Sequence, residues 1–146
     1  MNADTRGSEK REAGTLLHGE LTEKILRVFY DVYNELGHGF LESVYEEAMS
    51  IALGQAGLKV DRQLPLKVMF RGFLVGDFRA DVVVERAVLL ELKAATGLDP
   101  VHEAQLLNYL RATEIEVGLL LNFGPKPQFK RMIYENVKKG SRGSHG

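Results

Sequence analysis

The chain of 146 residues contains no cysteine, which excludes disulfide bonds, thiolate catalysis and cysteine-ligated zinc. No apolar run approaches the roughly 20 residues that a helix needs to cross a bilayer. The polar and charged residues 1–14 are not expected to act as a secretory signal. A chain with these absences fits the cytoplasm.

Several familiar functional patterns are also missing. The formal net charge is −1, so the chain lacks the basic excess of proteins that hold nucleic acid through charge alone. Its four histidines show no His-x-x-x-His spacing, so a zinc site is not expected. There is no Gly-x-Ser-x-Gly elbow and no Gly-rich phosphate loop. What remains is a chain that is 45% apolar, enough for one globular domain with a core.

Hydrophobic periodicity predicts a domain over residues 17–137, between a disordered segment (1–16) and a flexible basic tail (138–146). Helices are expected over residues 20–36, 41–53 and 101–112, the last with Asp99 as its N-cap. Strands are expected over residues 60–63, 66–70, 73–77, 79–85, 88–93 and 116–123, with an edge strand near 129–133. Pro65 and the Arg71-Gly72 pair are taken as strand breaks. This order predicts an α/β protein of the α+β type, with a mixed sheet flanked by helices.

Charged residues interrupt two apolar strands of this pattern. Glu91 and Lys93 are two residues apart on one strand and therefore share a face, and Asp81 on the preceding strand can join them. Two carboxylates and an ammonium group at one point suit a divalent-metal site that cuts phosphodiester bonds. A surface salt bridge on a solvated sheet face is an equally open reading of the spacing alone.

The register of these two strands decides whether the three side chains meet. A two-residue turn would put Asp81 opposite Leu92, on the wrong face. A three-residue connection over residues 86–88 would put Asp81 opposite Lys93. The site hypothesis therefore predicts either a connection of odd length or a β-bulge.

Two helices carry further candidates. Gln105 and Tyr109 lie four residues apart on one face of the third helix, where they could orient phosphate, water or the carboxylates. An ordinary helix rim explains them as well. Glu42 begins the second helix, where an acid also complements the helix dipole.

Four segments in this order resemble a known family. Residues 39–45 (GFLESVY) match the pattern of the GxxExxY family, and Arg79-Ala80-Asp81, Glu91-Leu92-Lys93 and residues 105–109 (QLLNY) follow in that family's order. The resemblance covers residues 21–133, and the family is placed in the PD-(D/E)XK nuclease superfamily. One departure is Ala80, where the superfamily motif has proline.

The resemblance implies a restriction-endonuclease-like core and Mg²⁺- or Mn²⁺-dependent hydrolysis of nucleic acid, with DNA favoured over RNA. By the resemblance, Asp81 and Glu91 would bind the metal, Lys93 would position or activate the attacking water, and Glu42 would be an accessory acid near the metal. Gln105 and Tyr109 match a helix motif of the exonuclease-like branches.

Two other functions remain open on the sequence. One is a nuclease-like module that binds nucleic acid or a partner protein without cutting it. The other is a homodimeric scaffold that pairs through the edge strand near Phe129. The retention of Asp81, Glu91 and Lys93 favours catalysis over the first of these.

Overall fold

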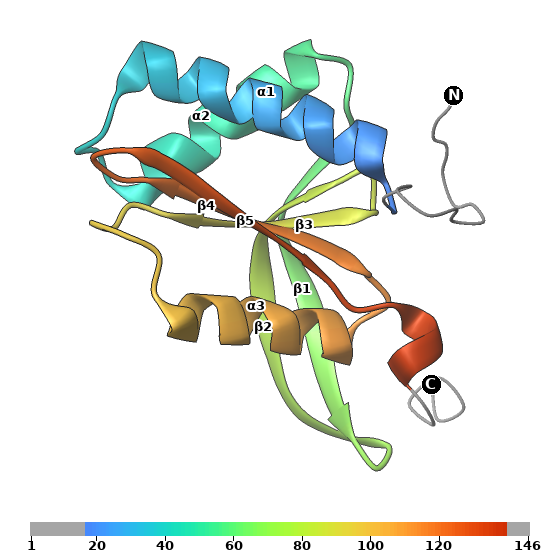
Figure 1. Cartoon of the computed structure of the whole chain (residues 1–146). Helices are drawn as coiled ribbons and strands as arrows, with labels where there is room; N and C mark the ends of the chain where they lie inside the picture. Colours follow the sequence, from blue (N-terminus) through green and yellow to red (C-terminus); the bar gives the residue numbers. More distant parts are fainter. Residues whose placement is uncertain (1–16, 140–146) are drawn as a thin grey trace.

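The structure is a computed structural model that describes residues 17–139. It has three layers, in which helices α1 (Gly19–Leu36) and α2 (Glu42–Gln55) cover one face of a five-stranded sheet and helix α3 (Pro100–Ala112) covers the other (Figure 1). None of the described helices is long and apolar enough to cross a membrane. The arrangement confirms the predicted mixed sheet flanked by helices.

The sheet consists of β1 (Val60–Phe70), β2 (Phe73–Val84), β3 (Val88–Lys93), β4 (Val117–Phe123) and β5 (Pro127–Ile133), in that spatial order. Only the β3–β4 pair is parallel, and α3 forms the crossover between these two strands. The other neighbours are antiparallel. The central strands β3 and β4 are the apolar ones, as expected for strands covered on both faces.

Two apolar clusters hold the layers together. The cluster beneath α1 and α2 contains, among others, Ile25, Phe29, Met49, Val82, Leu90 and Leu119. The cluster beneath α3 contains Ala80, Val83, Leu89, Leu106, Leu110, Ile115 and Leu120. Alternate residues of the central strands supply the two clusters, so the pleat fixes which side chains face which helix.

The first two strands are longer than the sequence predicts. Residues 60–63 and 66–70 form one strand, and residues 73–77 and 79–85 form another, which ends at Val84. Pro65 does not break β1, because β1 is an edge strand and can lack one backbone donor. Only the Arg71-Gly72 break is confirmed, with φ of 51° and 82° in a tight turn. The described order is therefore α-α-β-β-β-α-β-β, with two strands fewer than predicted before α3.

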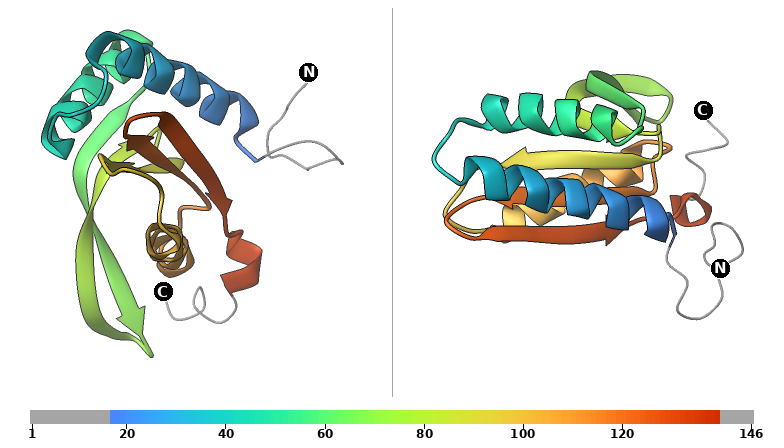
Figure 2. Two further views of the ribbon diagram at one scale, coloured as in Figure 1. Left: turned by 60° about the vertical axis from the view of Figure 1, so that its left-hand side comes forward. Right: turned by 90° about the horizontal axis from the view of Figure 1, so that it is seen from above.

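The resulting β1–β2 hairpin extends well past the body of the domain (Figures 1 and 2). Its register runs from the Val60–Val84 pair to the Phe70–Phe73 pair, with one irregularity near Met69. The inner half of the hairpin belongs to the sheet between the helices. The outer half carries a run of exposed apolar side chains.

The remaining elements agree with the sequence more closely. Helix α3 begins as predicted, because the Asp99 carboxylate accepts a hydrogen bond from Val101 N and Pro100 is in the first turn. A short 3-10 helix, η1 (Asn136–Lys139), contains Lys138 and Lys139, the first residues of the predicted tail. The predicted segment 1–16 and residues 140–146 lie outside the described residues.

Candidate active site

The β2–β3 register brings Asp81 and Glu91 side by side, one residue beyond the last backbone pair, Val82–Leu90. Three residues, 85–87, join the strands, and Glu85 and Arg86 have φ of 55° and 53°. Val84 pairs with Val88 and Val82 with Leu90, so the next pair along this register is Asp81 and Glu91. The predicted odd length is confirmed.

The predicted pairing of Asp81 with Lys93 is wrong. The connection begins one residue earlier than expected, because Val88 is fully buried and belongs to β3 instead of the turn. Moving one apolar residue from turn to core shifts the pairing by two positions. The shift preserves the shared face and brings the two carboxylates closer in register.

Asp81 lies where the facing of β2 changes. Val82 packs beneath α1 and α2, whereas Ala80 packs beneath α3, so strict alternation is interrupted at Asp81. Gln63, across from Asp81 in the β1–β2 register, has φ of 51°. The Asp81 carboxylate turns to the neighbouring strand, where its Oδ2 accepts a hydrogen bond from Leu92 N at 3.0 Å.

Glu91 and Lys93 point to the α3 side of the sheet. Leu89 is in the cluster beneath α3, and the residues two and four positions later share its face. Burial first, and the charge of Asp81 second, raise the pKa of Glu91 to about 7, against a lowering by Lys93. Asp81, Glu91 and Lys93 therefore lie within electrostatic reach of one another, as the sequence predicts.

The pKa of Asp81 is also raised. Burial is the main cause, opposed by the hydrogen bond from Leu92, and the carboxylates of Glu46 and Glu42 raise it further. Neighbouring carboxyl groups whose pKa values are both raised by burial are common in functional sites.

Helix α3 brings Tyr109 to the same place. Burial raises the pKa of the Tyr109 hydroxyl, and the charge of Glu91 adds to the effect, while a hydrogen bond with Gln105 opposes it. The Tyr109 ring stacks on Phe78 of β2, with centroids 3.6 Å apart. The predicted common face of Gln105 and Tyr109 is thus confirmed as a contact, and Tyr109 stays a neutral hydroxyl that can donate a hydrogen bond.

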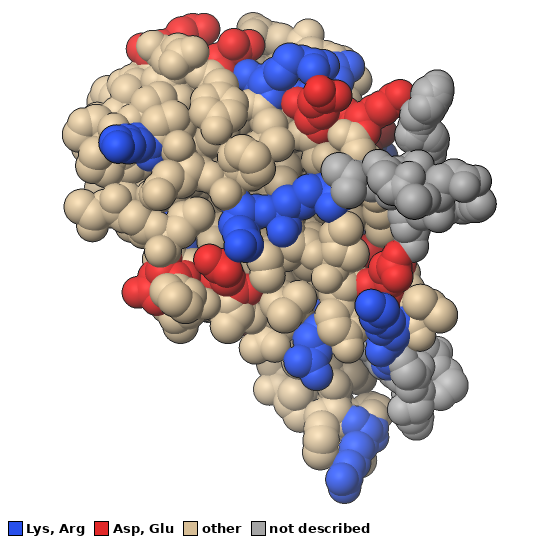
Figure 3. Space-filling view, viewed as in Figure 1, with Lys and Arg blue, Asp and Glu red and all other residues tan. Residues whose placement is uncertain are grey.

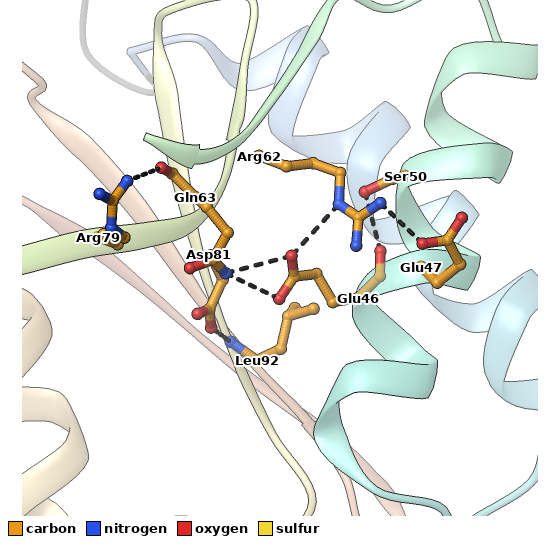
Figure 4. Close-up of polar contacts among 8 residues, drawn as sticks. All are labelled: Glu46, Glu47, Ser50, Arg62, Gln63, Arg79, Asp81 and Leu92. Atoms are coloured by element: carbon orange, nitrogen blue, oxygen red, sulfur yellow. Dashed lines mark hydrogen bonds and ion pairs between the residues drawn. The ribbon is translucent and has the colours of Figure 1, made fainter. Parts of the chain in front are cut away.

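Helix α2 supplies two carboxylates to the site, Glu42 and Glu46, and Figure 4 shows Glu46 with its partners Arg62 and Gln63. Glu42, at the first helical position, is exposed and acts electrostatically on both Asp81 and Glu91. Glu46, one turn later, accepts hydrogen bonds from Arg62 Nε at 3.2 Å and from Gln63 Nε2 at 3.1 and 3.2 Å. Sequence reasoning did not select Glu46, although its spacing of four from Glu42 places both on one helix face.

Two residues of the Gly-x-x-Glu-x-x-Tyr pattern shape the turn before α2. Gly39 has φ of 110°, which favours glycine. The buried Tyr45 donates its hydroxyl hydrogen to Gly37 O at 2.7 Å and accepts one from Phe40 N at 3.3 Å. The turn is therefore fixed from both sides, and this sets where α2 and Glu42 begin.

A second buried contact fixes the loop that follows Lys93. Asn122 at the end of β4 accepts a hydrogen bond from Ala95 N at 2.9 Å and donates one to Ala95 O at 3.0 Å. Gly124 lies so close that a Cβ there would meet Ala95 O at 2.2 Å. Asn122 was missed on the sequence, where its only signal is an amide within an apolar strand.

The side chains at this point fit a divalent metal ion, although no group of three or more His, Asp or Glu side chains among residues 17–139 is close enough to enclose one. Asp81 and Glu91 are oxygen donors that repel each other, and a cation between them would remove that repulsion. Mg²⁺ commonly takes one or two protein carboxylates and completes its shell with water. A three-carboxylate set that includes Glu42, as the resemblance implies, is not assembled.

Comparison with known proteins gives the class of this fold and site. The family model of the PD-(D/E)XK nuclease superfamily matches residues 19–132, so the chain belongs to that superfamily. The finer resemblance to the GxxExxY family stays a prediction. No curated protein matches the chain.

Among solved structures, the chain is similar to the one titled "Crystal structure of SSO0001". The two are 16% identical, with a TM-score of 0.45, and the match covers 79% of this chain and 78% of that chain. A likeness at this level carries no argument about function.

Proposed function

We propose that the protein is a metal-dependent nuclease that hydrolyses phosphodiester bonds, with DNA as the favoured substrate and Mg²⁺ or Mn²⁺ as the cofactor. The observation that carries the proposal is the register of β2 and β3, whose last backbone pair, Val82–Leu90, is followed directly by Asp81 and Glu91, with Lys93 two residues after Glu91 on the same face. Membership of the nuclease superfamily supports the same activity.

The electrostatics of the site favour a metal-dependent reaction. Besides burial, the charges of Glu46 and Glu42 raise the pKa of Asp81, and those of Asp81 and Glu42 raise the pKa of Glu91. Lys93 is the cation that lowers both pKa values. Such a site repels a phosphodiester, whose charge must be neutralised before it can approach. In our proposal Asp81 and Glu91 hold the metal ion, which when bound supplies positive charge at the phosphate and an acidified water.

The protein's own side chains divide the remaining work. Lys93 donates hydrogen bonds to the attacking water and holds it beside the phosphate. Tyr109, kept neutral by its raised pKa, donates a hydrogen bond to a phosphate oxygen, and Gln105 orients that hydroxyl. Glu42 contributes an accessory carboxylate at the solvent side of the site.

The test is cleavage of end-labelled single- and double-stranded DNA and RNA in Mg²⁺ or Mn²⁺, with and without EDTA. We expect metal-dependent products that are lost in Asp81→Asn and reduced at least a hundredfold in Lys93→Ala, because both variants remove a group that acts on the reacting atoms. Lys130→Ala is the matched control, since Lys130 is exposed on β5, two strands away from β3. Full activity of either site variant would overturn the assignment.

The same experiment separates the alternative of a silent binding module. Nucleic acid that is bound by the folded wild-type chain but is not cut in either metal would favour that alternative. Cleavage of RNA in preference to DNA would keep the nuclease and correct the substrate.

A further inference from the structure

The outer half of the β1–β2 hairpin exposes apolar side chains that the fold does not use. The exposed fractions are 56% for Phe70, 72% for Phe73 and 56% for Leu74, and Met69 and Val75 are also more than half exposed. These residues surround the tight turn at Arg71-Gly72, at the far end of the projecting hairpin (Figure 2). Large aromatic side chains at the end of a protruding ribbon mark an interaction surface.

The charges on the hairpin favour a polyanionic partner. Between residues 64 and 80 there are three cations, Lys67, Arg71 and Arg79, and a single carboxylate, Asp77. The whole chain, by contrast, has a net charge of −1. Figure 3 shows basic side chains along this protrusion and at its lower end. Arg71 lies over the Phe70 ring, 4.9 Å from its centroid, so that an aromatic face and a cation are presented together.

The hairpin is also continuous with the candidate site. Asp81 and Phe73 are on the same strand, eight residues apart, and eight residues of extended strand span about 26 Å. Base pairs of a duplex rise by about 3.4 Å each, so this length corresponds to about 8 base pairs. A two-stranded ribbon fits within the major groove of DNA, whereas a helix bundle or a flat sheet does not offer such a projection.

We propose that the tip of the β1–β2 hairpin, Met69–Val75, docks into a groove of duplex nucleic acid about 8 base pairs from the phosphate bound at Asp81 and Glu91. Phe70 and Phe73 contact bases, and Arg71 contacts the backbone phosphates beside them. The inference rests on the proposed function, because it takes the site at Asp81 as the place where the nucleic acid is held.

The test measures the affinity of fluorescent DNA duplexes of increasing length, from about 6 to about 24 base pairs, by anisotropy. The protein is the Lys93→Ala variant in Mg²⁺, whose cleavage we expect to be slow enough for binding to be measured before the duplex is cut. We expect affinity to rise in a step once the duplex extends beyond about 8 base pairs from the site. Replacing both aromatic residues (Phe70→Ser with Phe73→Ser) should weaken long duplexes roughly tenfold and leave the shortest ones unchanged.

Two further variants sharpen the test. Arg71→Ala should make the slope of log affinity against log salt less steep by about 0.9, as expected for the loss of one phosphate contact. Ile51→Ser is the matched control, because Ile51 is an apolar side chain of similar exposure, 53%, on α2. It should change neither the length step nor the salt slope.

The possible failures are distinguishable. A length step that persists in the double variant, or an equal loss at every length, overturns the hairpin contact while leaving the nuclease untouched. A wild-type chain that never cleaves but shows the step overturns the proposed activity and keeps the contact. A dimer by sedimentation that becomes a monomer when Phe70 and Phe73 are replaced assigns the tip to self-association and overturns the inference.

Discussion

At the scale of single residues, the carboxylates on α2 differ in what they act on. Glu46 has a side chain that is 14% exposed, and it raises the pKa of Asp81. Glu47 is 59% exposed and forms an ion pair with Arg62 at 2.7 Å. Arg62 thus binds both carboxylates and holds the Glu46 side chain between β1 and the site, instead of being a free cation for nucleic acid.

This difference gives a prediction for Glu46. The Glu46→Gln variant keeps the size of the side chain and removes its charge. A nearby carboxylate attracts a divalent cation by on the order of 1 kcal/mol in a water-like dielectric, so half-maximal cleavage should need about fivefold more Mg²⁺. Titration of the cleavage rate with Mg²⁺ measures this change. Glu47→Gln, which touches the same arginine, should leave the requirement unchanged, and an equal effect of both variants would rule out a special role for Glu46.

The site residues that could be predicted from the sequence differ from those that could not in whether they interrupt a local pattern. Asp81, Glu91 and Lys93 stand out because charged residues interrupt apolar strands, and the structure places them together. Glu46 and Asn122 look ordinary in the sequence. Their positions depend on contacts with Arg62, Gln63 and Ala95, which are far away along the chain and become neighbours only in the fold.

At the scale of elements, the β3–α3 loop is fixed by the end of β4. Asn122 binds both backbone polar groups of Ala95, and Tyr33 of α1 donates its hydroxyl hydrogen to Gly124 O at 2.7 Å. Three elements therefore meet next to the end of the strand that carries Lys93. The position of the Lys93 side chain depends on this contact, since the loop leaves β3 directly after it.

Gly124 is the position in this contact that leaves the least room for a side chain. In Gly124→Ala the added Cβ would meet Ala95 O at 2.2 Å, so the backbone of the loop must move. Overpacking of this kind costs about 1–3 kcal/mol, which for a chain of this size lowers the melting temperature by roughly 3–9 °C. Gly97→Ala is the matched control in the β3–α3 loop that Gly124 contacts, because the nearest atom to a Cβ there is 4.0 Å away. Equal melting temperatures of both variants and wild type would contradict the tight contact.

The elements also show where a sequence stops being informative. The helices are recognisable because their caps and apolar spacing are local, as Gly37 and Asp99 illustrate. The length of β1 cannot be recognised in the same way. A proline breaks a central strand but is tolerated in an edge strand, as Pro65 is in β1, and edge position is a property of the whole sheet. The β2–β3 register likewise depended on whether Val88 would be buried, which a hairpin pattern alone does not determine.

At the scale of the whole molecule, one sheet serves both stability and the proposed chemistry. Val82 and Leu90 pack beneath α1 and α2, and Leu89 packs beneath α3, while Asp81 and Glu91 are the residues next to Val82 and Leu90 on the same two strands. A carboxylate held at such a place is partly desolvated by the core. The burial that raises the pKa of Glu91 must therefore also make the free energy of unfolding depend on pH.

The stability of the metal-free protein should consequently depend on pH with a defined sign. The pKa of Glu91 is about 7 in the folded chain and 4.5 for an unperturbed glutamate, so between these values the unfolded state binds fewer protons than the folded state. Stability is therefore highest below pH 4.5 as far as this group is concerned, and it falls as the pH rises to about 7, by up to about 3 kcal/mol in total. Urea unfolding in EDTA across this pH range measures the loss.

Variants and metal assign that loss to the site. Glu91→Gln should lack most of the decline and be more stable than wild type above pH 7, whereas Glu23→Gln, an exposed change on α1, should keep it. Adding Mg²⁺ above pH 7 should restore stability to wild type but not to Glu91→Gln, because a ligand that binds only the folded state stabilises it by mass action. If the stability of Glu91→Gln fell as steeply with pH as that of wild type, another group would cause the loss. The carboxylates of Asp81 and Glu91 would then not be the cation site of the fold.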